Sequence, residues 1–181
     1  ISELRQGDNT YFLRLLTFVP GTFYVDVKNQ TDKLRANLSV SLAKLNKALV
    51  NFIHPASGRY LIWDLKQASN VIRQFQGAIK GEIEKAHIDK ILSMFETHVM
   101  PIASKLPKQV IHNDANDYNV LVNDAGKVCG LIDFGDMVES YRINELAISV
   151  TYAILEQDEP IEIMASMVDA YHKVNPLTDE E

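Results

Sequence analysis

The sequence has almost no cysteine: Cys129 is the single one in 181 residues. One thiol forms no internal disulfide and no Cys-based zinc site, which excludes a disulfide-stapled secreted scaffold and a zinc-ribbon domain. No apolar run approaches the roughly 20 residues that a membrane helix needs. The first residues, ISELRQGDNT, lack the basic and apolar regions of a secretory signal. We therefore expect a cytoplasmic protein with no membrane partner.

Positive charge is also scarce. The chain has 18 Lys and Arg against 24 Asp and Glu, a formal net charge of −6, and no basic stripe is visible. Binding to a phosphate backbone needs clustered Lys and Arg, so we expect no nucleic-acid partner. Hydrophobic residues make up 46% and charged residues 23%, which is typical of a soluble globular chain of one domain or two small ones.

Hydrophobic periodicity predicts a mixed chain, with helices on both sides of a group of short strands. Thr31 is the expected N-cap of the first helix, Asp64 caps the second, and Pro101 should kink or end the third. The expected elements are a strand at 10–19 after the tail of another strand, helices over 31–52, 64–79 and 81–105, strands at 109–111, 118–122 and 127–132, and helices over 143–154 and 161–171.

One loop, HNDANDYN at 112–119, carries more polar side chains than a plain turn needs. It holds one His, two Asp and three Asn between two apolar strands. A second polar cluster, DFGD at 133–136, follows the next strand. The residues at 123–126, Asn-Asp-Ala-Gly, predict a hairpin between the two strands. Such a hairpin would return Asp133 to the neighbourhood of Asn119.

Asp114, Asn119 and Asp133 are thus expected to converge at one end of a small sheet. Their hard oxygen atoms suit Mg²⁺, which takes one or two carboxylates and completes its shell with water and phosphate oxygens. They do not suit zinc, and no Ser or Cys elbow or Walker-type loop is present. Asp and Asn are common in turns for local geometry alone. We apply that explanation to the other polar residues nearby: Asn113, Asn116, Asp117 and Asn123.

These motifs resemble a known family. His-x-Asp at 112–114 followed by Asn119 is similar to the catalytic loop of protein kinase-like phosphotransferases, and DFG at 133–135 to their metal-binding segment. Because no Arg follows the His, the loop looks more like the aminoglycoside phosphotransferase family, the small-molecule branch of the fold. LRLLTFVPGT at 13–22 is similar to that family's hinge. Within the branch, the loops and YLIWDL at 60–65 resemble hydroxylysine kinase-type domains, including those fused to class III aminotransferases.

The resemblance implies an α+β fold, the large lobe of a protein kinase-like enzyme, mostly helical with a small β-hairpin sheet. Residues 1–21 would be a remnant of the small lobe and hinge, and 22–181 the large lobe, cut short at its C-terminus. The Gly-rich loop, strand Lys and helix Glu of such enzymes are not among these residues. We expect a fragment that is inactive alone, whose parent could carry an aminotransferase domain. The exposed edge of the strand at 10–19 could pair two copies.

The resemblance also implies roles for particular residues. Asp114 would accept the proton of the acceptor hydroxyl. Asn119 and Asp133 would hold Mg²⁺ at the phosphates of ATP. The backbone of Thr17 and Val19 would bind the adenine.

Other residues are expected to act in support. His112 should hold the loop by packing and a backbone hydrogen bond. Asp136 and Glu139 are either solvated helix-start acids or partners of an ammonium group on the substrate, and for Glu145 we favour the solvated acid. Trp63 is expected to be a core anchor rather than a substrate platform.

Together, these expectations predict a kinase that uses ATP to phosphorylate the hydroxyl of a small amino alcohol or hydroxy amino acid, such as hydroxylysine. An antibiotic kinase of the aminoglycoside type, a protein kinase and a non-catalytic kinase-like module remain as alternatives. The missing Arg argues against a protein kinase. The retained metal ligands argue against a decayed module.

Overall fold

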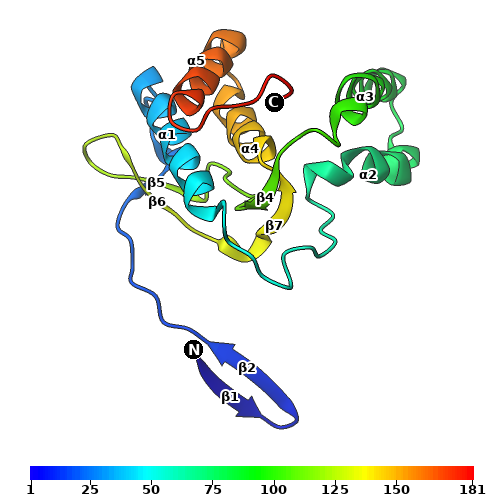
Figure 1. Cartoon of the computed structure of the whole chain (residues 1–181). Coiled ribbons are helices and arrows are strands. Elements are labelled where there is room, and N and C mark those ends of the chain that lie inside the picture. Colours follow the sequence, from blue (N-terminus) through cyan, green and yellow to red (C-terminus); the bar gives the residue numbers. More distant parts are fainter.

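The computed structural model describes residues 1–181, which form an α+β fold (Figure 1). The helices are α1 (Asp32–Leu49), α2 (Ala68–Phe75), α3 (Glu82–Met94), α4 (Ile143–Ile154) and α5 (Pro160–His172). The strands are β1 (Ser2–Gln6), β2 (Asn9–Leu13), β3 (Thr22–Phe23), β4 (Lys108–Ile111), β5 (Val120–Val122), β6 (Val128–Leu131) and β7 (Val138–Tyr141). None of the helices combines the length and the apolar character that spanning a membrane requires.

The strands form three small antiparallel groups. β3, β5 and β6 make a three-stranded sheet with β5 in the middle, and β4 pairs with β7. The predicted turn at 123–126 is confirmed: Asn123 Oδ1 accepts hydrogen bonds from the backbone N–H groups of Ala125 and Lys127, and Gly126 has a φ of 67°. The β5–β6 hairpin therefore runs out from the polar loop and back to it.

The β1–β2 hairpin stands away from the rest of the molecule, and an extended segment joins it to β3 (Figure 1). The predicted strand over 10–19 is wrong beyond Leu13. Ser2 pairs with Leu13, and no strand lies opposite residues 14–19. Residues 14–19 are mostly apolar, but no neighbouring strand offers backbone groups with which they could form the hydrogen bonds of a β-sheet.

The core lies where α1, α4 and α5 pack together beside the β3–β5–β6 sheet. The predicted N-cap of α1 is confirmed, since the Thr31 hydroxyl accepts a hydrogen bond from Leu34 N at 3.2 Å. Leu34, Leu38 and Leu42 are fully buried on the face predicted from their spacing. This packing fixes the position of α4, which lies behind the polar loop.

α2 and α3 form a separate arm beside the core (Figure 1). Asp64 caps the arm's first turn as predicted, accepting a hydrogen bond from Lys66 N. The helical stretch that contains α3 loses its regular geometry before Pro101, through a π-helical turn at Phe95–Val99 and a 3₁₀ turn at Met100–Ile102. Because proline lacks the N–H that a helix interior needs, this break confirms the expected effect of Pro101.

Candidate functional site

The polar loop between β4 and β5 holds Asp114 and Asn119 against each other. Asn119 Nδ2 donates hydrogen bonds to Asp114 Oδ2 at 2.7 Å and to the Asp114 carbonyl at 2.9 Å. Asn116 Nδ2 donates to Asp114 Oδ1 at 2.8 Å. Asn116 Oδ1 also accepts from the backbone N–H groups of Tyr118 and Asn119, which closes the loop. Two side-chain amides therefore fix the Asp114 carboxylate in one orientation.

The DFG segment begins next to this loop. Ile132 N donates a hydrogen bond to the Asn119 carbonyl at 3.0 Å, so Asp133 follows a residue that is bound directly to Asn119. Asp133 has left-handed backbone geometry with a φ of 59°, and its Oδ1 accepts from Gly135 N. Left-handed geometry is costly for a residue other than glycine and tends to occur at functional sites. Asn113, with a φ of 67°, is a second such residue in the site.

His112 links the two segments. Its Nδ1 accepts a hydrogen bond from Asp114 N, so the proton lies on Nε2, which donates to the Ile132 carbonyl at 2.9 Å. The ring also packs edge-on against Phe134, with centroids 4.6 Å apart. Burial lowers the pKa of His112 and keeps the ring neutral. One neutral imidazole thus connects the loop of Asp114 to the segment of Asp133.

Glu145 corrects the expectation of a solvated acid. Its side chain on the first turn of α4 is fully buried, and Oε2 accepts hydrogen bonds from His112 N at 2.6 Å and Asn113 N at 3.4 Å. Oε1 has no partner. Burial raises the pKa of Glu145 to about 7. A clue was present in the sequence, because helical spacing puts Glu145 on one face with Ser149 and Ala153, both of which are buried.

Replacing Glu145 should change how stability depends on pH. The folded pKa of about 7 lies above the ordinary 4.5, so folding takes up a proton between these values. Stability should therefore fall as pH rises from about 4.5 to about 7 and then level off, by on the order of 3 kcal/mol. Glu145→Gln keeps an acceptor oxygen for His112 N but cannot ionise, so the fall should shrink.

Urea unfolding of both proteins at pH 5 and pH 8 measures this difference. Glu162→Gln, at an exposed glutamate of α5, is the matched control and should follow the wild-type curve. Parallel pH dependence for wild type and Glu145→Gln would show that the buried carboxyl does not titrate as described.

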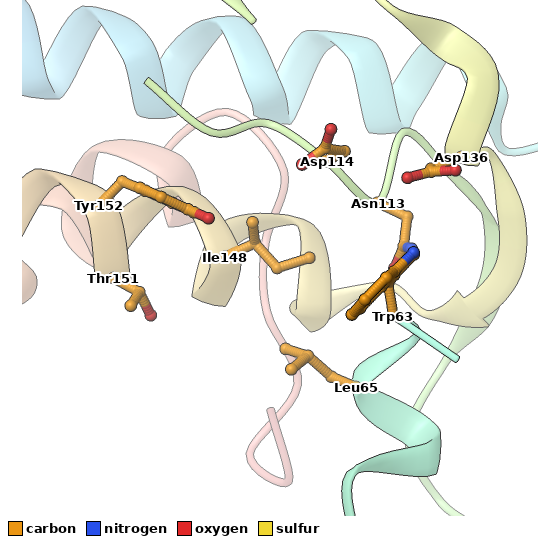
Figure 2. A pocket seen from close by; sticks show the side chains of 8 residues that line it. All are labelled: Trp63, Leu65, Asn113, Asp114, Asp136, Ile148, Thr151 and Tyr152. Carbon is orange, nitrogen blue, oxygen red and sulfur yellow. The ribbon is translucent and has the colours of Figure 1, made fainter. Parts of the chain in front are cut away.

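A cavity of about 470 Å³ opens beside Asp114 (Figure 2). Figure 2 shows Asp114 along one side, between Tyr152 at one end and Asp136 with Trp63 at the other. The residues that line it are Trp63, Leu65, Asn113, Asp114, Asp136, Ile148, Thr151 and Tyr152. The structure therefore brings two of the predicted carboxylates, Asp114 and Asp136, to one cavity.

Among the lining residues, Trp63 differs from expectation. Trp63 is 69% exposed, so the expected core anchor is wrong and its ring is free to meet a ligand. Asn113 has the left-handed φ of 67° that suits the expected turn residue, and its buried side-chain amide has no hydrogen-bond partner. Glu139 does not line the cavity: it lies on β7 with an exposed side chain, between the buried Val138 and Ser140.

The two residues proposed for adenine, Thr17 and Val19, line a different cavity of about 510 Å³. Six of its eight lining residues are hydrophobic. Neither Thr17 nor Val19 lies in a strand or helix, and their backbone N–H and C=O groups make no hydrogen bond. Ile132 lines this cavity and precedes Asp133, so the Asp133 segment lies next to the apolar slot.

The oxygen atoms of Asn119 and Asp133 fit a hard divalent cation. Asn119 uses its Nδ2 for hydrogen bonds and leaves Oδ1 free, and Asp133 uses Oδ1 and leaves Oδ2 free. No three His, Cys, Asp or Glu side chains gather into a group that could hold a metal by themselves. Two protein ligands with the rest supplied by water and phosphate is the usual pattern for Mg²⁺.

The fold is that of the kinase-like phosphotransferases, as predicted. An aminoglycoside phosphotransferase from Alicyclobacillus acidocaldarius superposes with a TM-score of 0.60 at 18% identity, covering 98% of this chain and 57% of the other. An amicoumacin kinase solved with AMP-PNP and Ca²⁺ superposes with a TM-score of 0.57 at 15% identity, covering 91% and 49%. At these identities the likeness establishes the fold alone.

Residues 2–180 match the model of the phosphotransferase enzyme family, so the chain belongs to that family. This confirms the resemblance drawn from the loops at 112–119 and 133–136. A hydroxylysine kinase from Xenopus laevis is 32% identical over 183 residues, covering 93% of this chain and 48% of the relative. The chain thus spans about half the length of this curated relative.

Proposed function

We propose that the protein is a small-molecule kinase that transfers the γ-phosphoryl group of ATP to the hydroxyl of an amino-bearing acceptor. The observation that carries this proposal is the setting of Asp114. Its carboxylate is held by two amides at the wall of a cavity of about 470 Å³, and one of these amides belongs to Asn119, whose Oδ1 is free. A fixed base beside an acceptor-sized cavity is what phosphoryl transfer to an alcohol needs.

Asp114 would act as the base. The amides of Asn116 and Asn119 donate to its two oxygens and leave further lone pairs open to the cavity. An acceptor hydroxyl in the cavity would donate its hydrogen bond to Asp114 and pass its proton there as the oxygen attacks phosphorus. Fixed orientation of the base lowers the entropic cost of reaching the transition state.

Asn119 and Asp133 would hold Mg²⁺, which neutralises charge on the nucleotide phosphates. The apolar slot would take the adenine, with the free backbone groups of Thr17 and Val19 as its hydrogen-bond partners. The amicoumacin kinase of similar fold was solved with an ATP analogue and a divalent cation, which supports this assignment. His112 and Glu145 would position the loop without touching either substrate.

Asp136 and Trp63 would determine which acceptor group binds at their end of the cavity. A carboxylate beside an exposed aromatic face suits an ammonium group, through a charge-assisted hydrogen bond of about 1.5–3 kcal/mol and a cation–π contact. The relative with 32% identity is a hydroxylysine kinase, and hydroxylysine carries an ammonium next to its hydroxyl. We therefore favour a hydroxy amino acid or amino alcohol. Glu139 has no part in this proposal because it does not line the cavity.

An acceptor screen with the whole protein tests the proposal. We expect ATP-dependent turnover with hydroxylysine and weaker turnover with ethanolamine, homoserine, choline or aminoglycosides. Asp136→Asn should raise KM for an ammonium-bearing acceptor about tenfold, since one charge-assisted hydrogen bond is lost. Asp124→Asn, in the exposed β5–β6 turn, is the control. Phosphorylation of casein, with none of the small acceptors turned over, would refute the proposal.

A further inference from the structure

A second cavity, of about 550 Å³, shares one lining residue, Tyr152, with the first. The charged residues of the first cavity are all acidic, Asp114 and Asp136. The second cavity has charged residues of both signs: Lys28, Arg35, Asp117 and Glu156. The two cavities therefore differ in the kind of ligand group that each can hold.

Arg35 provides a buried cation at the second cavity. The residue is 8% exposed, Nη2 donates to Gln157 Oε1 at 2.6 Å, and Nη1 donates to Asp32 Oδ1 at 3.0 Å. Asp32 is 84% exposed, so water competes strongly for it. Arg35 Nε makes no hydrogen bond. The hydrogen-bond partners of this buried guanidinium are one neutral amide and one solvated carboxylate. An added anion would therefore stabilise its charge further.

Three further charged residues of the second cavity, Lys28, Asp117 and Glu156, have unpaired side chains. Lys28 is exposed and makes neither an ion pair nor a hydrogen bond, and the Asp117 carboxylate makes none either. Asp117 lies three residues after Asp114 on the same loop. The cavity can thus bind a ligand carboxylate through its cations and a ligand ammonium through a free carboxylate. A carboxylate and an ammonium are the two charged groups of an α-amino acid.

We propose that the second cavity binds the α-amino-acid head of the acceptor, with its carboxylate at Lys28 and Arg35 and its α-ammonium at Asp117. This inference rests on the proposed function. The acceptor chain would then pass Tyr152, place its hydroxyl at Asp114 and put a second ammonium at Asp136. The class selected is an amino acid whose hydroxyl lies between its head and a distal ammonium. Hydroxylysine has this order of groups, whereas ethanolamine and choline lack the head.

The test compares two acceptors that differ only in the carboxylate: hydroxylysine and its decarboxylated form, 1,5-diaminopentan-2-ol. For the wild-type whole protein we expect kcat/KM to be at least tenfold lower with the decarboxylated acceptor, mainly through KM, because a charge-assisted contact is lost. Lys28→Ala should lower kcat/KM for hydroxylysine several-fold and leave the decarboxylated acceptor unchanged. Arg35→Gln should do the same more strongly.

Lys33→Ala is the matched control, since Lys33 is an exposed lysine of α1 that lines neither cavity, and both acceptors should behave as in wild type. If Arg35→Gln fails to fold, kcat/KM falls for both acceptors alike, and the Lys28→Ala result then serves as the test. Equal use of the two acceptors by wild type, or an equal loss for both in Lys28→Ala, would overturn the head-group site while the kinase activity stands. No turnover of any small acceptor would overturn the proposed function, and this inference with it.

Discussion

Asp114→Asn is expected to lower kcat by about 10²- to 10⁴-fold, because it would remove the proposed base for the hydroxyl proton. Nucleotide affinity should change little, since the proposed metal ligands and the apolar slot are untouched. The asparagine would place an NH₂ group opposite one of the two amide donors now bound to the carboxylate. Some loosening of the loop is expected, so folding should be checked by thermal unfolding.

Steady-state turnover and calorimetric nucleotide binding of the Asp114→Asn protein measure the two effects separately. Asp124→Asn makes the same chemical change in an exposed turn and should leave both quantities alone. A folded Asp114→Asn protein that kept more than half of its turnover would show that Asp114 is not the base.

Replacing Asp133 should have a broader effect. Asp133→Ala is expected to abolish turnover and the Mg²⁺ dependence of nucleotide binding together, because the free Oδ2 would be lost. Alanine is also strained at a φ of 59°, which should cost stability of roughly 1 kcal/mol or more. Asp133→Asn tolerates this backbone geometry and keeps an oxygen to accept from Gly135 N, but it replaces the free Oδ2 with an NH₂ group that cannot bind a metal.

Calorimetry of ATP binding with and without Mg²⁺ separates these contributions. We expect wild type to bind more tightly with Mg²⁺, and both variants to bind equally with and without it. The asparagine variant should also unfold near the wild-type temperature. If the Mg²⁺ dependence survives in a folded Asp133→Asn protein, then Asp133 does not hold the metal.

The parts of the site that depend on local sequence could be predicted. Asp114 and Asn119 meet within one short loop, and the turn at 123–126 fixes where β6 returns. The cap at Thr31 likewise depends on a residue only three positions away. Local spacing and turn chemistry are sufficient in such cases.

The errors arose where distant segments meet. Glu145 is buried because α4 packs behind a loop more than 30 residues earlier in the chain, and its contacts to His112 and Asn113 exist only in the folded state. Trp63 is apolar, but the segment that carries it runs along the cavity rather than into the core. The second cavity joins residues near 25–35, 117 and 152–157, and no single stretch of sequence reveals it.

Phosphorus NMR of the whole protein with ATP, Mg²⁺ and hydroxylysine is the most direct test of phosphoryl transfer to a small acceptor at Asp114. We expect a phosphomonoester resonance to grow as ATP is consumed, to need Mg²⁺, and to be almost absent with Asp114→Asn. Consumption of ATP without any phosphomonoester of the acceptor, or a resonance undiminished in Asp114→Asn, would contradict the assignment of Asp114 as the base of a small-molecule kinase.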